Sequence, residues 1–336
     1  MLQNVNVPGR VLPRAANLLR AAALLAPSAL AAAGLASWVH LRAPWPALLA
    51  LGAALAGYVL APPLLLHLLG ARAVDPSGAP HLLAMIRELA ARCAMPVPRV
   101  CVLDSHSPNA WAVGHAGGAH SLMLTSGILR LLDEAELRAV LAHEFSHMER
   151  WDPLPSTLAA AFGGLLSALA HAGAPGPSDR MADEAPAPAP LWLLLAPLSA
   201  GMARLARARW QDIVADRAGA ELCGDPAALV RALHLLHADE RRVLALAVRH
   251  PATASMMVCD PLPQRGGLRR MFRAHPPLEQ RLRALGEQPV VAAQASGAAI
   301  EGAFEGGVDQ QAGQAVQQGA DEGCAEAANL ESRAQR

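Results

Sequence analysis

Lysine is absent from this 336-residue chain, and aromatic residues make up only 3% of it. The basic residues are all arginine, which is typical of GC-rich bacterial coding. Together, 28 arginines balance 28 acidic residues to a formal net charge of zero. Binding to phosphate backbones needs concentrated positive charge. Because no basic cluster occurs beyond a few arginines, we do not expect nucleic acid among the partners.

Paired cysteines are also lacking. The cysteines are odd in number and scattered, and no two of them form a CxxC pair: Cys93, Cys101, Cys223, Cys259 and Cys324. Neither a disulfide framework nor a thiolate zinc site is therefore expected, and a reducing compartment fits this pattern.

Charge is missing from two long stretches near the amino terminus, residues 21–39 and 43–66. Each approaches or exceeds the ~20 residues that cross a bilayer as a helix, and the mean hydropathy of the chain is +0.25. A cleaved signal peptide would explain only the first stretch. We therefore predict a membrane hairpin within residues 1–74, with helices at about 18–40 and 44–69.

Arginines flank this hairpin on both of its outer sides. They are Arg10, Arg14 and Arg20 before it and Arg72, Arg87, Arg92 and Arg99 after it, with only Arg42 in the loop between. By the positive-inside rule, both flanks are cytoplasmic.

Residues 76–150 read as a soluble α+β unit. Helical spacing covers 81–95, and short strands are predicted at 99–104, 109–114 and 120–129. Asp133 followed by Glu136 forms a capping box, which predicts a helix from about residue 134 through the histidines of the next segment.

A second apolar pair follows at 154–172 and 189–203, separated by a Pro-rich acidic loop at 173–188. These runs are shorter, so they span the bilayer, pack on the domain or dip into one leaflet. The second run is followed by Arg204, Arg207 and Arg209. By the positive-inside rule, this end of the run lies in the cytoplasm.

Three more helices are predicted in the carboxyl-terminal half, at 203–222, 226–238 and 275–285. The tail at 287–336 is rich in Ala, Gly, Gln and Glu. It is too polar and simple to bury a core, so we predict that it is disordered.

The stretch "VLAHEFSHMER" (140–150) carries the chemistry. Residues four apart share a helix face, so His143 and His147 can bind one metal ion, with Glu144 beside them as the base. Zinc lowers the pKa of a bound water, and Glu144 would take its proton. The alternative is that two polar residues share a helix face by chance. The capped helix and the preceding strands favour zinc.

Catalytic zinc takes three protein ligands and keeps one position open. The next helix offers three carboxylates as candidates, Asp212, Asp216 and Glu221. Asp212 and Asp216 are one turn apart, so one can bind the metal while the other orients a ligand histidine.

Together these residues resemble the HtpX-like membrane zinc metallopeptidases, whose relatives include the CAAX prenyl protease and a mitochondrial quality-control peptidase. The resemblance covers about residues 10–286. It is carried by the first hairpin, "NAWAVG", "LLDEAELRAVLAHEFSHMERWD", "RWQDIVADRAGAELCGDPAALVRAL" and "FRAHPPLEQRLRAL". It implies an α+β, mostly helical, zincin-type (minigluzincin-like) domain with a small sheet over residues 75–286. A second hydrophobic hairpin, at about 154–203, is inserted in this domain.

The resemblance also implies roles for individual residues. His143 and His147 bind one zinc ion per chain, and Glu144 is the catalytic base. The family's third ligand is a glutamate, but Asp212 stands there, and Asp216 matches the family's aspartate. The shorter side chain requires the helix to lie closer to the metal, or a water to bridge. Asn109 and His275 match positions near the cleft, where they can contact the substrate or the transition state.

We therefore expect a metalloendopeptidase of the bacterial inner membrane, multi-pass, with its catalytic domain in the cytoplasm. The resemblance implies polypeptide substrates, chiefly membrane proteins. One alternative is a catalytically silent adaptor that keeps the fold. Another, a prenyl-protein protease, would require more transmembrane helices.

Overall fold

The computed structural model of the chain describes residues 11–39, 44–75, 78–116, 120–170, 190–239, 247, 250–262, 272 and 275–286. All of them belong to one unit, Met1–Pro289. The acidic loop at 173–188 and the tail at 287–336, predicted to be disordered, lie outside the described residues.

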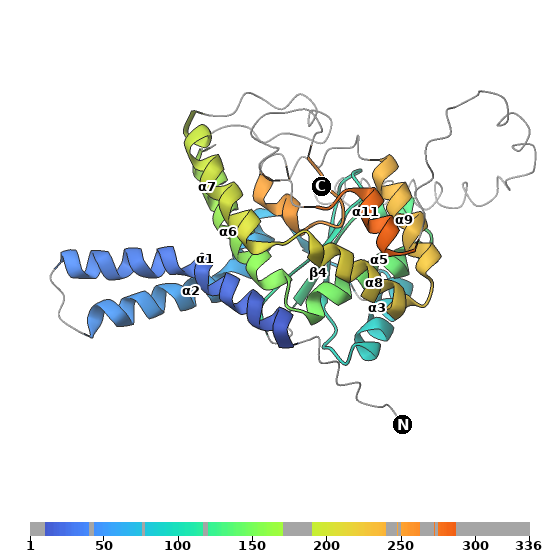
Figure 1. The fold of residues 1–336 in the computed structure, drawn as a ribbon, viewed down its shortest axis with the longest axis horizontal. Helices are drawn as coiled ribbons and strands as arrows, with labels where there is room; N and C mark the ends of the chain where they lie inside the picture. Colours follow the sequence, from blue (N-terminus) through green and yellow to red (C-terminus); the bar gives the residue numbers. More distant parts are fainter. Residues whose placement is uncertain are drawn as a thin grey trace, which may run out of the picture. The chain divides into compact units, whose positions relative to one another are not determined.

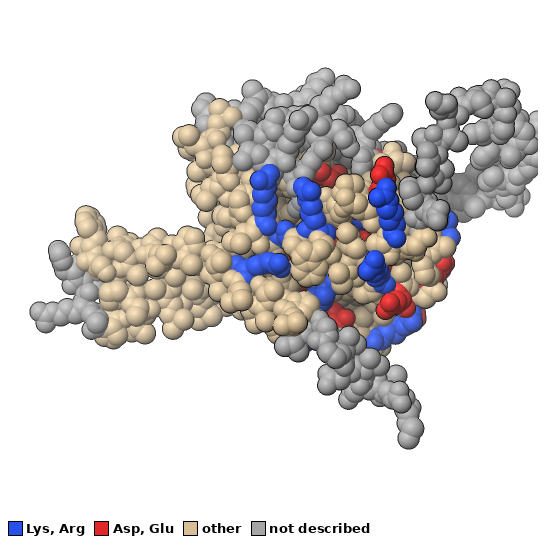
Figure 2. Space-filling model, in the orientation of Figure 1, with Lys and Arg blue, Asp and Glu red and all other residues tan. Residues whose placement is uncertain are grey.

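Two long apolar helices pair at the amino terminus, α1 (Val11–Trp38) and α2 (Trp45–Leu68). Both are long and apolar enough to cross a membrane. Large apolar side chains on them, such as Leu30, Trp38 and Leu51, are exposed. On the face seen in Figure 2, the described residues at the end of this pair away from the sheet show no charged side chain. This surface suits lipid.

Helix α1 begins at Val11, seven residues before the predicted start at 18. Polar residues near its beginning contact the rest of the unit, because Arg14 donates to the carbonyl oxygen of Glu149 and lies over the ring of Trp151. The contacts keep this end helical although it is not apolar.

The second apolar pair forms α6 (Pro153–Ala170) and α7 (Pro190–Ala206). Helix α6 is also long and apolar enough to cross a membrane, but 67% of its residues are buried inside the protein. It contacts α1, α2, α7 and the sheet. This burial favours packing on the domain over full exposure to lipid.

Four strands form one mixed sheet in the order β1-β2-β4-β3. They are β1 (Arg72–Ala73), β2 (Arg99–Leu103), β3 (Ala110–Gly114) and β4 (His120–Thr125). β2 and β4 run parallel, and the other pairs are antiparallel.

The predicted strand at 120–129 is wrong beyond Thr125. There the Thr125 side chain accepts a hydrogen bond from the backbone N–H of Ile128 and caps α4 (Ser126–Leu131). An N-cap of this kind starts a helix even in an apolar run.

The remaining helices pack on the sheet and on one another (Figure 1). They are α3 (Pro80–Arg92), α5 (Glu134–Glu149), α8 (Trp210–Cys223), α9 (Pro226–Ala238), α11 (Leu278–Ala284) and the 3-10 helix η3 (Pro251–Met256). The predicted capping box of α5 is present, with Asp133 and Glu136 bonded reciprocally to backbone N–H groups.

The predicted continuous helix at 203–222 is wrong, because the chain breaks between α7 and α8. The Gln211 side chain accepts a hydrogen bond from the backbone N–H of Ala208, and the Arg207 side chain is buried. Both contacts stabilise a new helix start beside α5.

Helices α5 and α8 lie very close where they cross. A Cβ atom added to Gly219 of α8 would lie 2.8 Å from both the Cα and the backbone N of His143. Neither neighbour can rotate away, because both are backbone atoms. Glycine at this position therefore sets the spacing between the two helices.

We expect Gly219→Ala to push α8 away from α5, destabilise the fold by more than 1 kcal/mol, and weaken metal binding. Denaturation and zinc titration in detergent would measure both effects. Gly201→Ala in α7 is the matched control, because no atom lies within 4 Å of its added Cβ. Equal behaviour of the two variants would contradict the close-crossing argument.

Candidate metal centre

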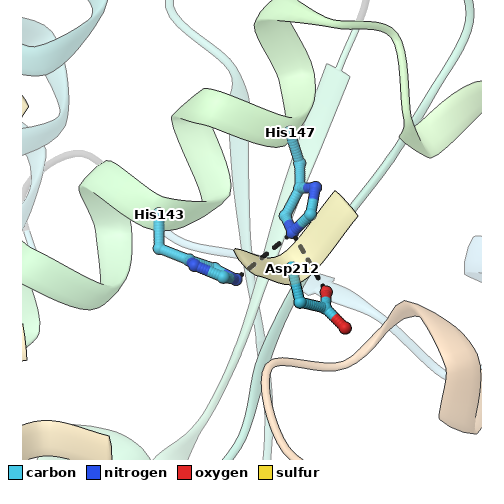
Figure 3. A group of neighbouring side chains, drawn as sticks. All are labelled: His143, His147 and Asp212. Atoms are coloured by element: carbon cyan, nitrogen blue, oxygen red, sulfur yellow. Dashed lines mark hydrogen bonds and ion pairs between the residues drawn. The ribbon is translucent and has the colours of Figure 1, made fainter. Parts of the chain in front are cut away.

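Three buried side chains converge between α5 and α8 (Figure 3). His143 and His147 lie one turn apart on α5, and Asp212 lies in the first turn of α8. Each offers one ligand atom, and these atoms all lie within 4.8 Å of one another. Among the described residues this is the one cluster of at least three such side chains.

The spacing of these atoms suits zinc. The Nε2 atoms of His143 and His147 are 3.2 Å apart, and His147 Nε2 is 3.5 Å from Asp212 Oδ1. Two ligands at ~2.1 Å from a tetrahedral ion are about 3.4 Å apart. Two imidazoles and one carboxylate are also a donor set that zinc accepts. The residues present therefore fit the ion.

Behind His143 lies a carboxylate held by an arginine. His143 Nδ1 is 2.8 Å from Asp216 Oδ1. Asp216 accepts two hydrogen bonds from the Arg281 guanidinium, at 2.7 and 2.8 Å. Burial alone would raise the pKa of Asp216, but the charge and hydrogen bonds of Arg281, together with His143, hold this pKa below its usual range. The ionised Asp216 directs His143 Nε2 toward the cluster.

Behind His147 lies a second carboxylate, from the turn after α5. His147 Nδ1 is 2.7 Å from Asp152 Oδ2, which also accepts from Arg150. Burial would raise the pKa of Asp152, yet the hydrogen bond and charge of His147, with Arg150, lower it. With its Nδ1 proton directed at Asp152, His147 keeps the Nε2 lone pair for a metal.

Asp212 has two further partners. His275 Nδ1 lies 3.2 Å from Asp212 Oδ2, and the buried Arg207 donates to Asp212 Oδ1. Burial would raise the pKa of Asp212, but the charge of Arg207 and the neighbouring imidazoles of His147 and His275 hold it well below its usual range. Arg207 is also 3.0 Å from His147 Nε2. A metal ion at these atoms therefore requires the guanidinium to shift.

Glu144 is buried beside the cluster, and within the described residues its Oε1 has no hydrogen-bond partner. Loss of solvent raises its pKa to about 7, although the charges of His147 and Arg207 oppose the shift. Burial also lowers the pKa of His143 to about 4, so this imidazole is neutral at pH 7 and can act as a ligand. A carboxyl with a raised pKa can both take and give a proton near neutrality.

Asn109 directly precedes β3, and both its amide oxygen and its amide nitrogen have backbone partners. Its Oδ1 accepts from the backbone N–H groups of Ala110 and Val258, and its Nδ2 donates to the carbonyl oxygen of Cys259. These bonds attach the segment after η3 to the sheet. The Asn109 side chain therefore stabilises the contact between the sheet and this segment. Few of its hydrogen-bonding groups remain available to a substrate.

Sequence reasoning missed most of the side chains that hold the ligands. Arg207 was read as a membrane flank, but it is buried against Asp212. Arg281 lies in a helix with a second arginine, Arg283, so nothing in the sequence singles it out. Asp152 follows the histidine motif directly, and that proximity is a signal that could have found it. Glu221, a candidate ligand by spacing, is exposed and lies outside the cluster.

The family follows from comparison with known proteins. Residues 76–288 match the model of peptidase family M48. The chain therefore belongs to this family, and its site and apolar helices are those of a membrane metallopeptidase.

Particular relatives are HtpX proteases. The chain is 40% identical over 238 residues to "Protease HtpX homolog" from Methylibium petroleiphilum, covering 69% of this chain and 83% of that one. It is 38% identical over 240 residues to the Burkholderia mallei homologue of the same name, covering 70% and 83%. These matches confirm the resemblance to HtpX-like peptidases.

A solved structure, the crystal structure of S. mikatae Ste24p, is similar with a TM-score of 0.39 and 20% sequence identity. The match covers 69% of this chain and 56% of that chain.

The raised pKa of Glu144 predicts how the stability of the metal-free protein depends on pH. When the pKa of a carboxyl is higher in the folded protein than in the unfolded one, its full contribution to stability is present below the unfolded pKa of 4.5. This contribution is lost as pH rises through the folded pKa of about 7. Glu144→Gln should therefore be more stable than the original at pH 8, by up to about 3 kcal/mol, and no more stable near pH 4.

Denaturation with a chelator present, at both pH values, measures the difference. Glu134→Gln is the control, because Glu134 is exposed on the same helix. A gain that does not depend on pH would show that Glu144 is not the cause.

Proposed function

We propose that this membrane metallopeptidase is a zinc-dependent endopeptidase in which His143, His147 and Asp212 hold one zinc ion and Glu144 is the catalytic base. The observation that carries the proposal is the convergence of the three ligand atoms within 4.8 Å, beside a buried carboxyl whose pKa is about 7.

Zinc bound in such a site polarises a peptide carbonyl and makes a water acidic. The protein's own groups do the rest. Glu144 takes a proton from the attacking water and later delivers it to the leaving amine. Asp216 and Asp152 fix the ring orientation of the two histidines, so that neither must reorganise during the reaction.

His275 and Asn109 are proposed to act nearby. His275 Nδ1 contacts Asp212, and its Nε2 is 2.9 Å from the carbonyl oxygen of Ala254. It can hold the ligand carboxylate and, after a small shift, reach an oxyanion. Asn109, with its bonds to residues 258 and 259, supports the same side of the site more than it can contact a substrate.

Cellular roles are proposed from the relatives and from charge. The relatives named HtpX homologues are proteases, and a site next to apolar helices suits the degradation of damaged or unassembled membrane proteins. The arginines that flank the first hairpin support an inner-membrane location with the domain in the cytoplasm.

Glu144→Gln should bind zinc as the original does but lose proteolysis by at least 100-fold, because an amide cannot take the proton. Casein cleavage and zinc stoichiometry on one detergent-purified sample measure both. Cleavage at the original rate would overturn the assigned base.

Asp212→Ala should lose zinc and activity together, because two histidines alone hold the ion weakly. Asp212 Oδ1 already lies at a ligand-like distance from His147, so Asp212→Glu should keep zinc but crowd the site and lower activity. Glu221→Ala, on the exposed side of α8, is the control. If Asp212→Ala keeps its zinc, the third ligand lies elsewhere.

One observation favours a second candidate, a silent adaptor. The Arg207 guanidinium contacts Asp212 Oδ1 and His147 Nε2, and it already neutralises the carboxylate that a metal would bind. Zinc content decides between the two functions, because the enzyme carries about one ion per chain and the adaptor carries little or none.

A further inference from the structure

The first ten residues of α1 extend beyond the part that suits a bilayer. The uncharged stretch, residues 21–39, is about 28 Å long as a helix, close to the ~30 Å of a hydrocarbon core. Residues 11–20 precede it and carry Arg14, Asn17 and Arg20. Among these, the Asn17 side chain is completely buried.

Asn17 contacts the support of the metal centre. Its Nδ2 donates to Asp152 Oδ1 at 2.7 Å and lies 3.1 Å from the carbonyl oxygen of Arg150. Asp152 is the residue whose other oxygen contacts His147 Nδ1. A single carboxylate therefore joins the amide of α1 to a ligand of the candidate metal site.

The two oxygens of Asp152 have separate partners. Oδ2 faces His147 and Arg150, whereas Oδ1 accepts from Asn17 and from Gln211, each at 2.7 Å. Donors on both oxygens fix the rotation of the carboxylate. Without the amide donors on Oδ1, this carboxylate could turn away from the imidazole.

The same amide reaches the second ligand-bearing helix. Asn17 Oδ1 accepts from Gln211 Nε2 at 3.3 Å, and Gln211 directly precedes Asp212 in the chain. It also accepts from Arg20 at 2.7 Å, which orients the amide. Asn17 thus lies between the end of α5 and the start of α8.

We propose that Asn17 is a positioning residue for the metal centre, acting through Asp152 on His147, so that the first membrane helix is a structural part of the site. The inference rests on the proposed zinc site. Partners of this kind, outside the ligands, typically change metal affinity by ~10 to 100-fold. Asn17 is one contact further away than Asp152, so its effect falls near ~10-fold.

The test measures zinc affinity of the full chain in detergent, by competition with a chromophoric chelator. Asn17→Leu keeps the side-chain size but removes the donor, and should weaken zinc binding about 10-fold. Asn17→Ala serves if leucine prevents folding. Ser28→Ala is the control on α1 and should bind zinc normally, because among the described residues Ser28 bonds only to the Leu25 carbonyl oxygen of its own helix.

A double-mutant cycle separates positioning from general loss of structure. Asp152→Ala should weaken zinc binding more than Asn17→Leu does. Adding Asn17→Leu to Asp152→Ala should cause no further loss, because the path through Asp152 is already broken. The visible spectrum of the cobalt-substituted protein should change in Asn17→Leu and stay unchanged in Ser28→Ala.

Each outcome decides a different point. If the original chain binds no zinc, the proposed site fails and this inference fails with it. If the original binds zinc and Asn17→Leu binds it equally well, only the inference is overturned. An additive loss in the double variant also overturns it, because Asn17 would then act by another route.

Discussion

Three buried carboxylates, each matched with one buried arginine, are the constraint on which this structure depends. The pairs are Asp152 with Arg150, Asp212 with Arg207 and Asp216 with Arg281. A buried charge without a partner costs several kcal/mol, so such groups persist only when paired and hydrogen-bonded. The paired residues come from four segments, which are the turn after α5, the α7–α8 break, α8 and α11. The pairs therefore hold these segments around the same two histidines, His143 and His147. The charged pairs thus determine the arrangement of the helices around the site.

Much of the fold can be read from local patterns. The capping box at Asp133 and Glu136 sets the start of α5, and the uncharged runs mark the first hairpin, because these signals depend only on neighbouring residues. Two histidines four residues apart similarly indicate a metal site. The limits of prediction lie at Thr125 and Arg207. Thr125 caps a new helix, and at Arg207 the chain breaks between α7 and α8, although the composition of both runs suggests continuity.

The supporting residues of the site could not be found in this way. Arg281 is one of two arginines within 275–285, and only the fold brings it to Asp216, 65 residues earlier. Asn17 is a single polar residue between apolar ones, and its partner Asp152 is more than a hundred residues away. Such pairings depend on helix crossings such as that at Gly219, which sequence spacing does not encode. Candidate ligands can be predicted from a motif, whereas the partners of these side chains require the assembled structure.

The apolar pair α6–α7 separates the two halves of the candidate site along the chain, since His147 and Asp212 are 65 positions apart. Chains are synthesised from the amino terminus at ~5–20 residues per second. The histidines therefore leave the ribosome seconds before the aspartate, and during this interval the growing chain holds an incomplete ligand set. An unfinished chain cannot assemble the site until α6 and α7 have been made and α8 can cross α5. The order of synthesis thus delays completion of the proposed site until α8 has been made.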